Sequence, residues 1–243
     1  KCIQGLGIGI EELVLEPLAS SEAVLTEEEK QKGVILADIG GGTTDVAIFK
    51  DGSIWHTAII SVAGYQLTRD IAIGLGLPFD IAEEVKKSHG GVMPFHEGPA
   101  EPKPSQADER AVSYQELHRI LRARVEEILR LILLELPETK YEALVPSGLV
   151  LTGGSSNLAG IDVLGRDILR LPVRVGAPTR MLGISDSLYN PAYATSVGLL
   201  LWGARHQNAP ELKLRSLNDN LRRLIVQLRS FTYLMRRLPT WKR

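Results

Sequence analysis

The stretch Val34-Ile-Leu-Ala-Asp-Ile-Gly-Gly-Gly-Thr-Thr-Asp-Val-Ala-Ile-Phe49 decides the fold that this sequence predicts. Its two ends are apolar and β-favouring, so we expect strands over residues 34–38 and 46–49 with a hairpin turn between them. We call residues 40–42, three consecutive glycines, the first glycine turn. Glycine permits positive φ and close approach to a ligand, and successive N–H groups in such a turn attract an anion. The turn therefore predicts a phosphate site.

The side chains beside this turn extend the prediction. Thr43 and Thr44 carry hydroxyl donors that suit phosphate oxygens. Asp38 and Asp45 would repel a bare phosphate, which favours a divalent cation such as Mg²⁺ between carboxylates and phosphates. One carboxylate would then order the hydrated Mg²⁺ and the other would orient the attacking water. The alternative is a tight turn flanked by two solvated aspartates.

Composition places the chain among ordinary globular proteins. It has 243 residues, 44% hydrophobic and 23% charged, which fits one or two domains. Its single cysteine, Cys2, excludes an internal disulfide, and there is no signal peptide and no apolar run of membrane-spanning length, so we expect a reducing cytosol. Because the chain starts at Lys1 and not at methionine, we interpret it as a fragment.

The remaining pattern predicts alternating strands and helices. Before the first glycine turn, we expect a strand at 12–16, a helix at 17–25 and a solvated connection at 26–33. After it, the Asp-Gly pair at 51–52 predicts a hairpin and a third antiparallel strand at 54–62. Further helices are expected at 68–75, at 80–88 with Asp80 as N-cap, at 113–136, at 161–171 and at 191–203.

Two of the predicted helices, at 80–88 and at 113–136, carry charged side chains that could bind a ligand or a partner. Glu83 and Lys86 are three residues apart and share a helix face, an arrangement that is usually a weak surface ion pair. The helix at 113–136 has an apolar stripe and an arginine-rich opposite face, which is most simply a solvated one.

A second glycine turn (residues 153–154) follows the predicted buried strand that starts near residue 148. Glycines at a strand-to-helix turn let a flat adenine ring or a ribose lie against the backbone. By itself this is more often an ordinary α/β turn. Combined with the first glycine turn, it predicts the second half of a nucleotide cleft. The following helix at 191–203 has small residues on one side, which predicts close packing: Ala192, Ala194, Ser196 and Gly198.

The end of the chain is basic, with nine Lys/Arg against two acidic residues from 211 to 243, although the whole chain has a net charge of −1. After a linker at 206–220, apolar residues recur every three or four positions and arginines occupy the other side. This pattern predicts a helix in the membrane surface, and the alternative is a helix packed on the protein body. The predicted lipid-contacting residues are Leu224, Ile225, Leu228, Phe231, Met235 and Trp241.

Several stretches together resemble the FtsA family of bacterial cell-division proteins, within the actin-like ATPase superfamily. They are residues 15–20, 38–45, 49–53, 56–58, 82–86 and 191–195, and the resemblance covers residues 10–205. It implies an α/β actin-like (ribonuclease H-like) fold, with a mixed sheet flanked by helices and an incomplete N-terminal domain. Ser155 and Ala63 stand where relatives often have glycine.

The resemblance also implies the site and the domains. Phosphates would lie at Gly40, Gly41, Gly42, Thr43 and Thr44, and Asp38 and Asp45 would serve water and Mg²⁺, Asp38 through water. Glu83 and Lys86 would flank the ribose and adenine of ATP, with Gly153, Gly154 and Ser155 carrying the nucleoside. The implied domains are a first-domain remnant at 1–33, a core lobe at 34–62 and 145–205, an inserted lobe at 63–144, the linker at 206–220 and the basic helix at 221–243.

The function implied is ATP-dependent anchoring of FtsZ filaments to the cytoplasmic face of the bacterial inner membrane at the division site. ATPase activity would be slow, the fragment would be inactive alone, and partners would include FtsZ and further copies but no nucleic acid. The FtsZ tail would dock on the inserted lobe, with arginines at 119, 122, 124 and 130 offered to an acidic peptide. The alternatives are another actin-like ATPase, such as MreB or PilM, and a heat-shock-type chaperone ATPase, which would need a peptide-binding domain after residue 203.

Overall fold

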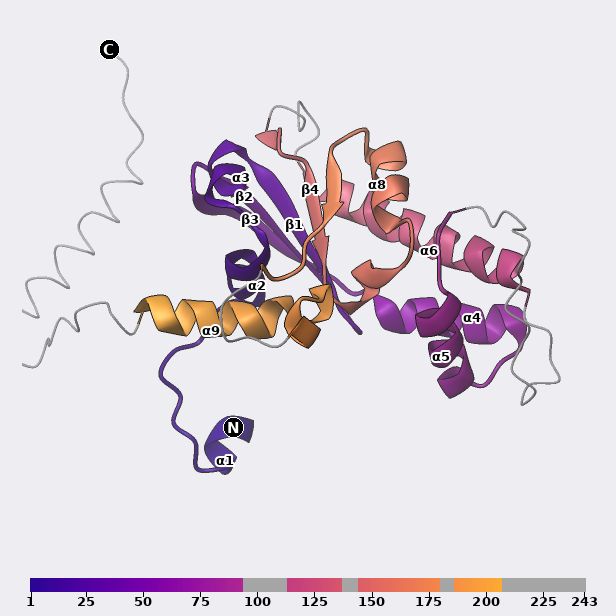
Figure 1. Ribbon diagram of the computed structural model, residues 1–243, viewed down its shortest axis with the longest axis horizontal. Coiled ribbons are helices and arrows are strands. Elements are labelled where there is room, and N and C mark those ends of the chain that lie inside the picture. Colours follow the sequence, from indigo (N-terminus) through magenta and orange to yellow (C-terminus); the bar gives the residue numbers. More distant parts are fainter. Residues whose placement is uncertain (94–112, 137–143, 180–185, 207–243) are drawn as a thin grey trace, which may run out of the picture. The chain divides into compact units, whose positions relative to one another are not determined.

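The hairpin around the first glycine turn forms the centre of a five-stranded mixed sheet in the computed structural model (Figure 1). The strand order is β3-β2-β1-β4-β5, in which β1, β2 and β3 are antiparallel neighbours and β4 and β5 run parallel to β1. The strands are β1 (Val34–Ile39), β2 (Thr44–Lys50), β3 (Ser53–Ile60), β4 (Leu149–Thr152) and β5 (Val173–Val175). The predicted mixed sheet is therefore confirmed.

The structure describes residues 1–93, 113–136, 144–179 and 186–206. Its α-helices are α1 (Cys2–Gly5), α2 (Glu16–Val24), α3 (Glu27–Lys32), α4 (Gly64–Leu75), α5 (Phe79–His89), α6 (Tyr114–Leu134), α8 (Ile161–Leu169) and α9 (Ala194–His206). Short 3₁₀ turns are η1 (Gly154–Asn157), η2 (Asp186–Leu188) and η3 (Pro191–Tyr193).

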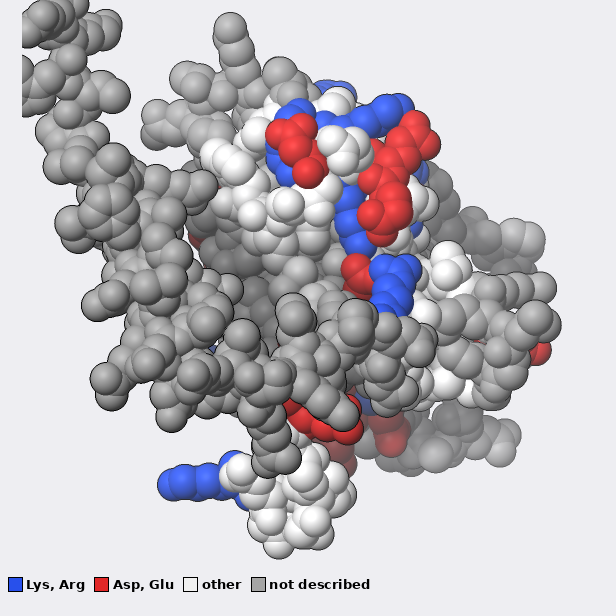
Figure 2. Space-filling model, turned by 90° about the vertical axis from the view of Figure 1, so that its left-hand side faces the viewer, with Lys and Arg blue, Asp and Glu red and all other residues white. Residues whose placement is uncertain are grey.

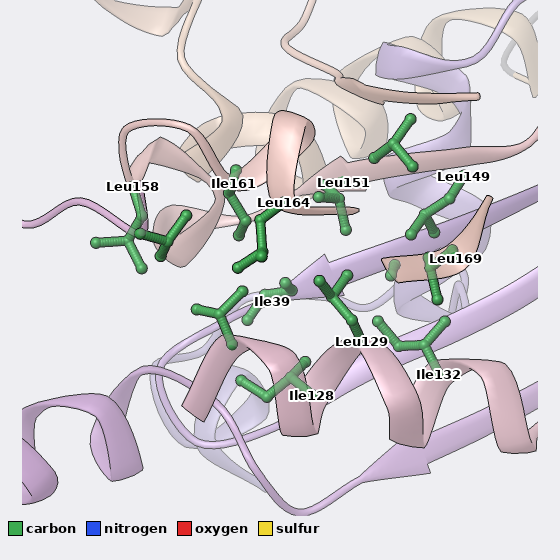
Figure 3. Close-up of a cluster of buried hydrophobic side chains, with 14 of the residues drawn as sticks. Ile39, Ile128, Leu129, Ile132, Leu149, Leu151, Leu158, Ile161, Leu164 and Leu169 are labelled. Atoms are coloured by element: carbon green, nitrogen blue, oxygen red, sulfur yellow. The ribbon is translucent and has the colours of Figure 1, made fainter. Parts of the chain in front are cut away.

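Helices cover both faces of the sheet. Successive side chains of a strand point to opposite faces, so each inner strand feeds two cores. On one face, Ile39, Leu149 and Leu151 of the sheet pack with α6 and α8, whose labelled side chains converge on them in Figure 3. On the other face, Val34, Leu36, Ala47 and Phe49 pack with α2 and α9. Burial on both sides explains why β1 is apolar at every position except Asp38.

Several element boundaries differ from the sequence prediction. No strand forms at 12–16, because Leu13 is 87% exposed and no neighbouring strand is present among the described residues. The predicted connection at 26–33 contains helix α3, whose capping box joins Thr26 and Glu29. Helix α4 starts at Gly64 and not at Thr68, and Asp80 lies in the first turn of α5, after Pro78 at the N-cap.

The basic face predicted on α6 is not a set of free cations. Arg119 pairs with Glu116, Arg122 and Arg130 pair with Glu126, and Arg124 pairs with Glu127 and with Asp70 of α4. Figure 2 shows the opposite side of the molecule, where α3 lies, and basic and acidic side chains lie next to one another there as well. An acidic peptide would have to displace carboxylates from the arginines of α6. The structure therefore gives no support to the predicted docking of the FtsZ tail on this face.

Other predictions reach beyond this description. The basic helix at 221–243 and most of the linker before it lie outside the described residues. None of the helices in the described part of the chain combines the length and the apolar composition that a membrane crossing needs. The division into a core lobe and an inserted lobe stays a prediction.

Candidate functional site

The two glycine turns and the helices α4 and α5 enclose a cavity of about 930 Å³. Nine of the predicted site residues line it: Asp38, Gly40, Gly41, Gly42, Glu83, Lys86, Gly153, Gly154 and Ser155. Residues from three separate stretches of the sequence thus meet in one place. Thr43, Thr44 and Asp45 are not among the lining residues.

The first glycine turn is open toward the cavity. None of its glycines has positive φ, so the expectation that they turn the chain in the left-handed region is wrong. A β-carbon on Gly41 or Gly42 would meet no atom within 4 Å. Neither residue donates its N–H to an oxygen of the described residues. The turn therefore offers free donors and free space, as a phosphate group requires.

The residues after this turn are engaged elsewhere. Thr44 is fully buried, and its hydroxyl donates to the carbonyl of Val62 at 2.8 Å. The Thr43 hydroxyl donates to Asp45 Oδ2 at 3.0 Å. The predicted phosphate contact through the Thr44 hydroxyl does not fit this geometry, because strand pairing turns that side chain away from the cavity.

Asp38 is a buried carboxylate at the edge of the cavity. It is 5% exposed and stands opposite Asp45 in the β1–β2 register. Its Oδ2 accepts hydrogen bonds from Ser20 at 2.8 Å and from Thr195 at 3.2 Å. Burial raises the pKa of Asp38 above its ordinary value, and the charge of Asp45 adds to this, while the two hydroxyls act in the opposite direction.

Glu16 is a third carboxylate at this place, and sequence reasoning assigned it no role. It lines the cavity at the start of α2 and accepts a 3.5 Å hydrogen bond from Thr195. Partial loss of water contact raises the pKa of Glu16, and the neighbouring charges of Asp45 and Asp38 raise it further. Both Glu16 and Thr195 lie in stretches that carry the family resemblance. That resemblance was the signal in the sequence that could have assigned them to the site.

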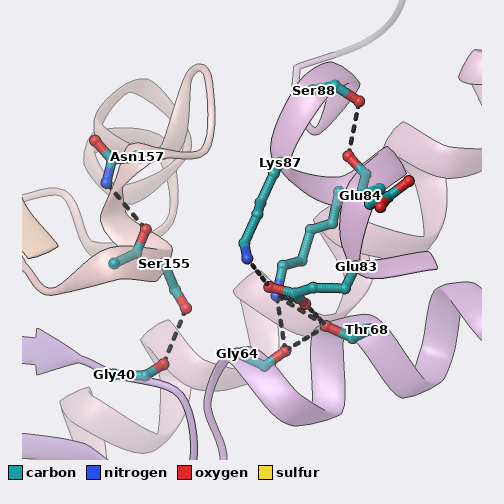
Figure 4. Close-up of polar contacts among 11 residues, drawn as sticks. Gly40, Gly64, Thr68, Glu83, Glu84, Lys87, Ser88, Ser155 and Asn157 are labelled. Atoms are coloured by element: carbon teal, nitrogen blue, oxygen red, sulfur yellow. Dashed lines mark hydrogen bonds and ion pairs between the residues drawn. The ribbon is translucent and has the colours of Figure 1, made fainter. Parts of the chain in front are cut away.

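Glu83 and Lys86 form a polar cluster on the opposite wall. Lys86 Nζ lies 2.6 Å from Glu83 Oε2 and also donates to Thr68 Oγ1 at 2.8 Å and to the Gly64 carbonyl at 3.2 Å. Lys87 reaches Glu83 Oε1 at 3.2 Å, and Thr68 contacts Glu83 directly (Figure 4). Burial opposes ionisation of Glu83, but hydrogen bonds from Lys86 and Thr68 lower its pKa on balance.

The second glycine turn is packed tightly against the first strand. Gly153 has φ 85°, and a β-carbon there would lie 2.4 Å from Asp38 Oδ1 and 2.6 Å from the Ile39 carbonyl. Ser155 Oγ donates to the Gly40 carbonyl at 3.0 Å, so the two glycine turns are joined directly (Figure 4). Gly64 N donates to the same carbonyl, also at 3.0 Å.

These residues fit a nucleotide better than an isolated metal ion. The free N–H groups of Gly41 and Gly42 at the first glycine turn suit an anion. No group of three or more His, Cys, Asp or Glu that could hold a metal occurs in the part of the chain that the structure describes. Mg²⁺ is commonly held by one or two carboxylates together with substrate phosphates, so Asp38 fits such a cation only when phosphates complete its shell.

Sequence comparison finds relatives over most of the chain. The family model described as "Cell division protein FtsA" matches residues 35–198. The cell division protein FtsA of Pseudomonas aeruginosa is 42% identical over 212 residues, which are 86% of this chain and 51% of that protein. The corresponding protein of Bacillus subtilis is 36% identical over 85% of this chain and 46% of its own length. The chain spans about half the length of the curated relatives it matches.

Solved structures show the same fold at lower identity. MreB5 of Spiroplasma citri bound to ADP superposes with a TM-score of 0.68 and 23% identity, over 86% of this chain and 64% of that one. A PilM-PilN type IV pilus biogenesis complex gives a TM-score of 0.57 at 23% identity, over 83% and 55%. These likenesses confirm the predicted actin-like fold.

Proposed function

Since this chain belongs to the FtsA family of cell-division proteins, we propose that its cavity binds ATP with Mg²⁺ and that the protein anchors FtsZ filaments to the membrane. The observation that carries the nucleotide part is the convergence of the two glycine turns and the Glu83–Lys86 cluster on one cavity. The similar MreB5 structure, which holds ADP, supports the same ligand class.

The residues divide by chemistry. The N–H groups of Gly41 and Gly42 face open space and would donate to phosphate oxygens. Glu83 would accept from ribose hydroxyls, and Lys86 holds Glu83 ionised and oriented. The second glycine turn, including Gly154 and Ser155, would support the flat base.

Asp38 would hold the cation through water, and a bound Mg²⁺ would neutralise phosphate charge. Asp45 would orient the attacking water, as the sequence predicted, although its buried position beside Thr43 makes this assignment depend on the ligand reaching it. Glu16 lines the cavity and has a raised pKa, so it would be a second carboxylate able to accept a proton from that water. Hydrolysis would be slow.

Nucleotide binding is tested by titrating the 243-residue chain with ATP and Mg²⁺ and following amide NMR shifts. We expect weak binding, because half of a cleft supplies only part of the contacts. The largest shifts should fall on Gly41, Gly42, Lys86 and Gly154. Shifts scattered over the surface, or none at millimolar nucleotide, would contradict the site.

The membrane part rests on the tail sequence alone. Its apolar residues recur at helical spacing, and each cation near an anionic surface adds about 1 kcal/mol to binding. A reporter fused to residues 206–243 should float with anionic vesicles and be released by salt. Leu228→Asp with Phe231→Asp should abolish flotation. Val226→Asp with Ser230→Asp adds the same charge on the arginine side of the predicted helix and should weaken flotation far less. Equal loss in both pairs would show that charge alone matters.

We also propose that the protein binds FtsZ and self-associates into filaments. The location that goes with this function is the cytoplasmic face of the inner membrane. Co-sedimentation with FtsZ filaments tests the first. Because the arginines of α6 are paired with carboxylates, Arg119→Glu with Arg122→Glu should leave co-sedimentation unchanged. Loss of the variant chain from the FtsZ pellet would restore that face as the docking site.

A further inference from the structure

Two hydroxyl groups from different helices hold the same oxygen of Asp38. Ser20 of α2 is fully buried and donates to Oδ2 at 2.8 Å. Thr195 of α9 lies 3.2 Å from this oxygen and 3.0 Å from Ser20 Oγ. The sequence prediction gave neither hydroxyl a role.

The second oxygen of Asp38, Oδ1, accepts no hydrogen bond from the described residues, and Asp38 lines the cavity. Since Oδ2 receives Ser20 and Thr195, the carboxylate cannot rotate without losing both contacts. Oδ1 is the oxygen that faces the second glycine turn, where a β-carbon on Gly153 would lie 2.4 Å from it. The absent side chain of Gly153 is what gives Oδ1 its space.

Thr195 has a choice of acceptors. Its single hydroxyl hydrogen can go to Asp38 Oδ2, to Ser20 Oγ or to Glu16 Oε1 at 3.5 Å. Ser20 has its hydrogen directed to Asp38, so it can accept from Thr195 at the same time. The two hydroxyls and the two carboxylates form one connected network across α2, α9 and β1.

Packing between the two helices fixes the positions of these hydroxyls. A β-carbon on Gly198 would lie 1.8 Å from the Ala19 carbonyl, so the backbones of α2 and α9 touch there. Ala19 precedes Ser20, and Gly198 is one helical turn after Thr195. The close contact predicted from the small residues of α9 is confirmed at Gly198, and it brings the two hydroxyls within reach of Asp38.

We propose that Ser20 and Thr195 are positioning residues that clamp Oδ2 of Asp38, so that Oδ1 alone is presented to the ligand in the cavity. The expected effect on ligand binding rests on the proposed nucleotide function. The hydrogen bonds from Ser20 and Thr195 to Asp38 do not depend on it. Hydrogen bonds to a charged acceptor are among the stronger ones in proteins, so the loss of either donor should free the side chain.

The test uses three variants of the 243-residue chain. Thr195→Val removes the hydroxyl and keeps the shape, Thr195→Ser keeps the hydroxyl and removes a methyl group, and Ser20→Ala removes the other donor. The NMR couplings from Asp38 Cγ to its backbone nitrogen and carbonyl carbon measure χ1 directly. We expect one rotamer in the parent and in Thr195→Ser, and averaged couplings in Thr195→Val and Ser20→Ala.

Binding of ATP with Mg²⁺, followed by amide shifts, supplies the second readout. We expect about a tenfold loss for Thr195→Val and Ser20→Ala and little change for Thr195→Ser. A single Asp38 rotamer in the Ser20→Ala/Thr195→Val double variant overturns the proposal. Equal weakening by Thr195→Ser and Thr195→Val also overturns it, because packing and not the hydroxyl would then be responsible. If the parent itself shows no nucleotide shifts, the nucleotide site fails, and the couplings still decide the clamp.

Discussion

The two glycine turns border the same cavity, yet glycine is needed at each for a different reason. At the first, no glycine has positive φ, and a side chain on Gly41 or Gly42 would enter empty space. At the second, Gly153 has φ 85° and is in contact with Asp38 and Ile39. The fold tolerates a β-carbon at Gly41 and Gly42 of the first turn and requires glycine at Gly153 of the second. Glycine at Gly41 and Gly42 is therefore explained by a ligand and not by the backbone.

Gly153→Ala should have the largest effect on the fold. A left-handed backbone and a β-carbon placed 2.4 Å from Asp38 Oδ1 should together lower the free energy of unfolding by about 3 kcal/mol. Urea denaturation measures this. Gly154→Ala is the matched control, because its β-carbon would meet only Ala192 at 3.9 Å and should cost less than about 1 kcal/mol. Similar losses of unfolding free energy in both variants would contradict the conclusion that glycine is required at Gly153 but not at Gly154.

Gly41→Val should separate binding from folding. We expect the free energy of unfolding to change by about 0.5 kcal/mol or less, because a β-carbon at this position would meet no atom within 4 Å. Binding of ATP with Mg²⁺ should fall by about tenfold or more, because phosphate and isopropyl group would compete for one volume. Gly203→Val, at another open glycine outside the cavity, should leave nucleotide shifts unchanged. Unchanged affinity in Gly41→Val would remove the ligand explanation.

Asp38→Asn should change how stability depends on pH. The folded-state pKa of Asp38 is raised, so the native state binds this proton more tightly than the unfolded chain does. The carboxyl contributes most to stability below its unfolded pKa, and that contribution is lost as pH rises through the folded value. We therefore expect Asp38→Asn to gain stability relative to the parent as pH rises through this window. Urea titrations from pH 3 to 8 measure the difference, and a parallel pair of curves would contradict it.

Ser155→Ala should have the smallest effect. It removes the 3.0 Å hydrogen bond that joins the two turns, while Gly64 still donates to the Gly40 carbonyl. We expect a loss of about 1 kcal/mol in the free energy of unfolding. Ser53→Ala, at an exposed serine, should cost less, and a loss as large as that of Gly153→Ala would show that this contact was underestimated.

The sequence predicted the fold through features that are local or periodic. The β1–β2 hairpin, the Asp51-Gly52 turn and α6 were predictable because strand propensity, turn chemistry and apolar spacing act over a few residues. The strand-like pattern at residues 12–16 was misleading because a strand needs a partner, which pattern alone does not reveal. The capping box of α3 was readable and was missed.

The site was predictable only in part. The glycine turns and the Glu83–Lys86 pair could be proposed from motifs and resemblance. The reach of Ser20 and Thr195 to Asp38 depends on α2 and α9 meeting across 175 positions of sequence. The direction of the Thr44 side chain likewise follows from pairing with β3, which sets its contact with Val62. Such contacts come from tertiary packing and leave no local signature.

The carbonyl oxygen of Gly40 accepts from Gly64 of α4 and from Ser155 of the second glycine turn. Three distant stretches of the chain thus meet at a single atom. An isotope label on this one carbonyl would give an infrared band whose frequency depends on both hydrogen bonds. The frequency of that band would report on the geometry of the cavity. It should rise when α4 or the second glycine turn moves away from β1, and it should stay constant when a ligand enters without moving either of them.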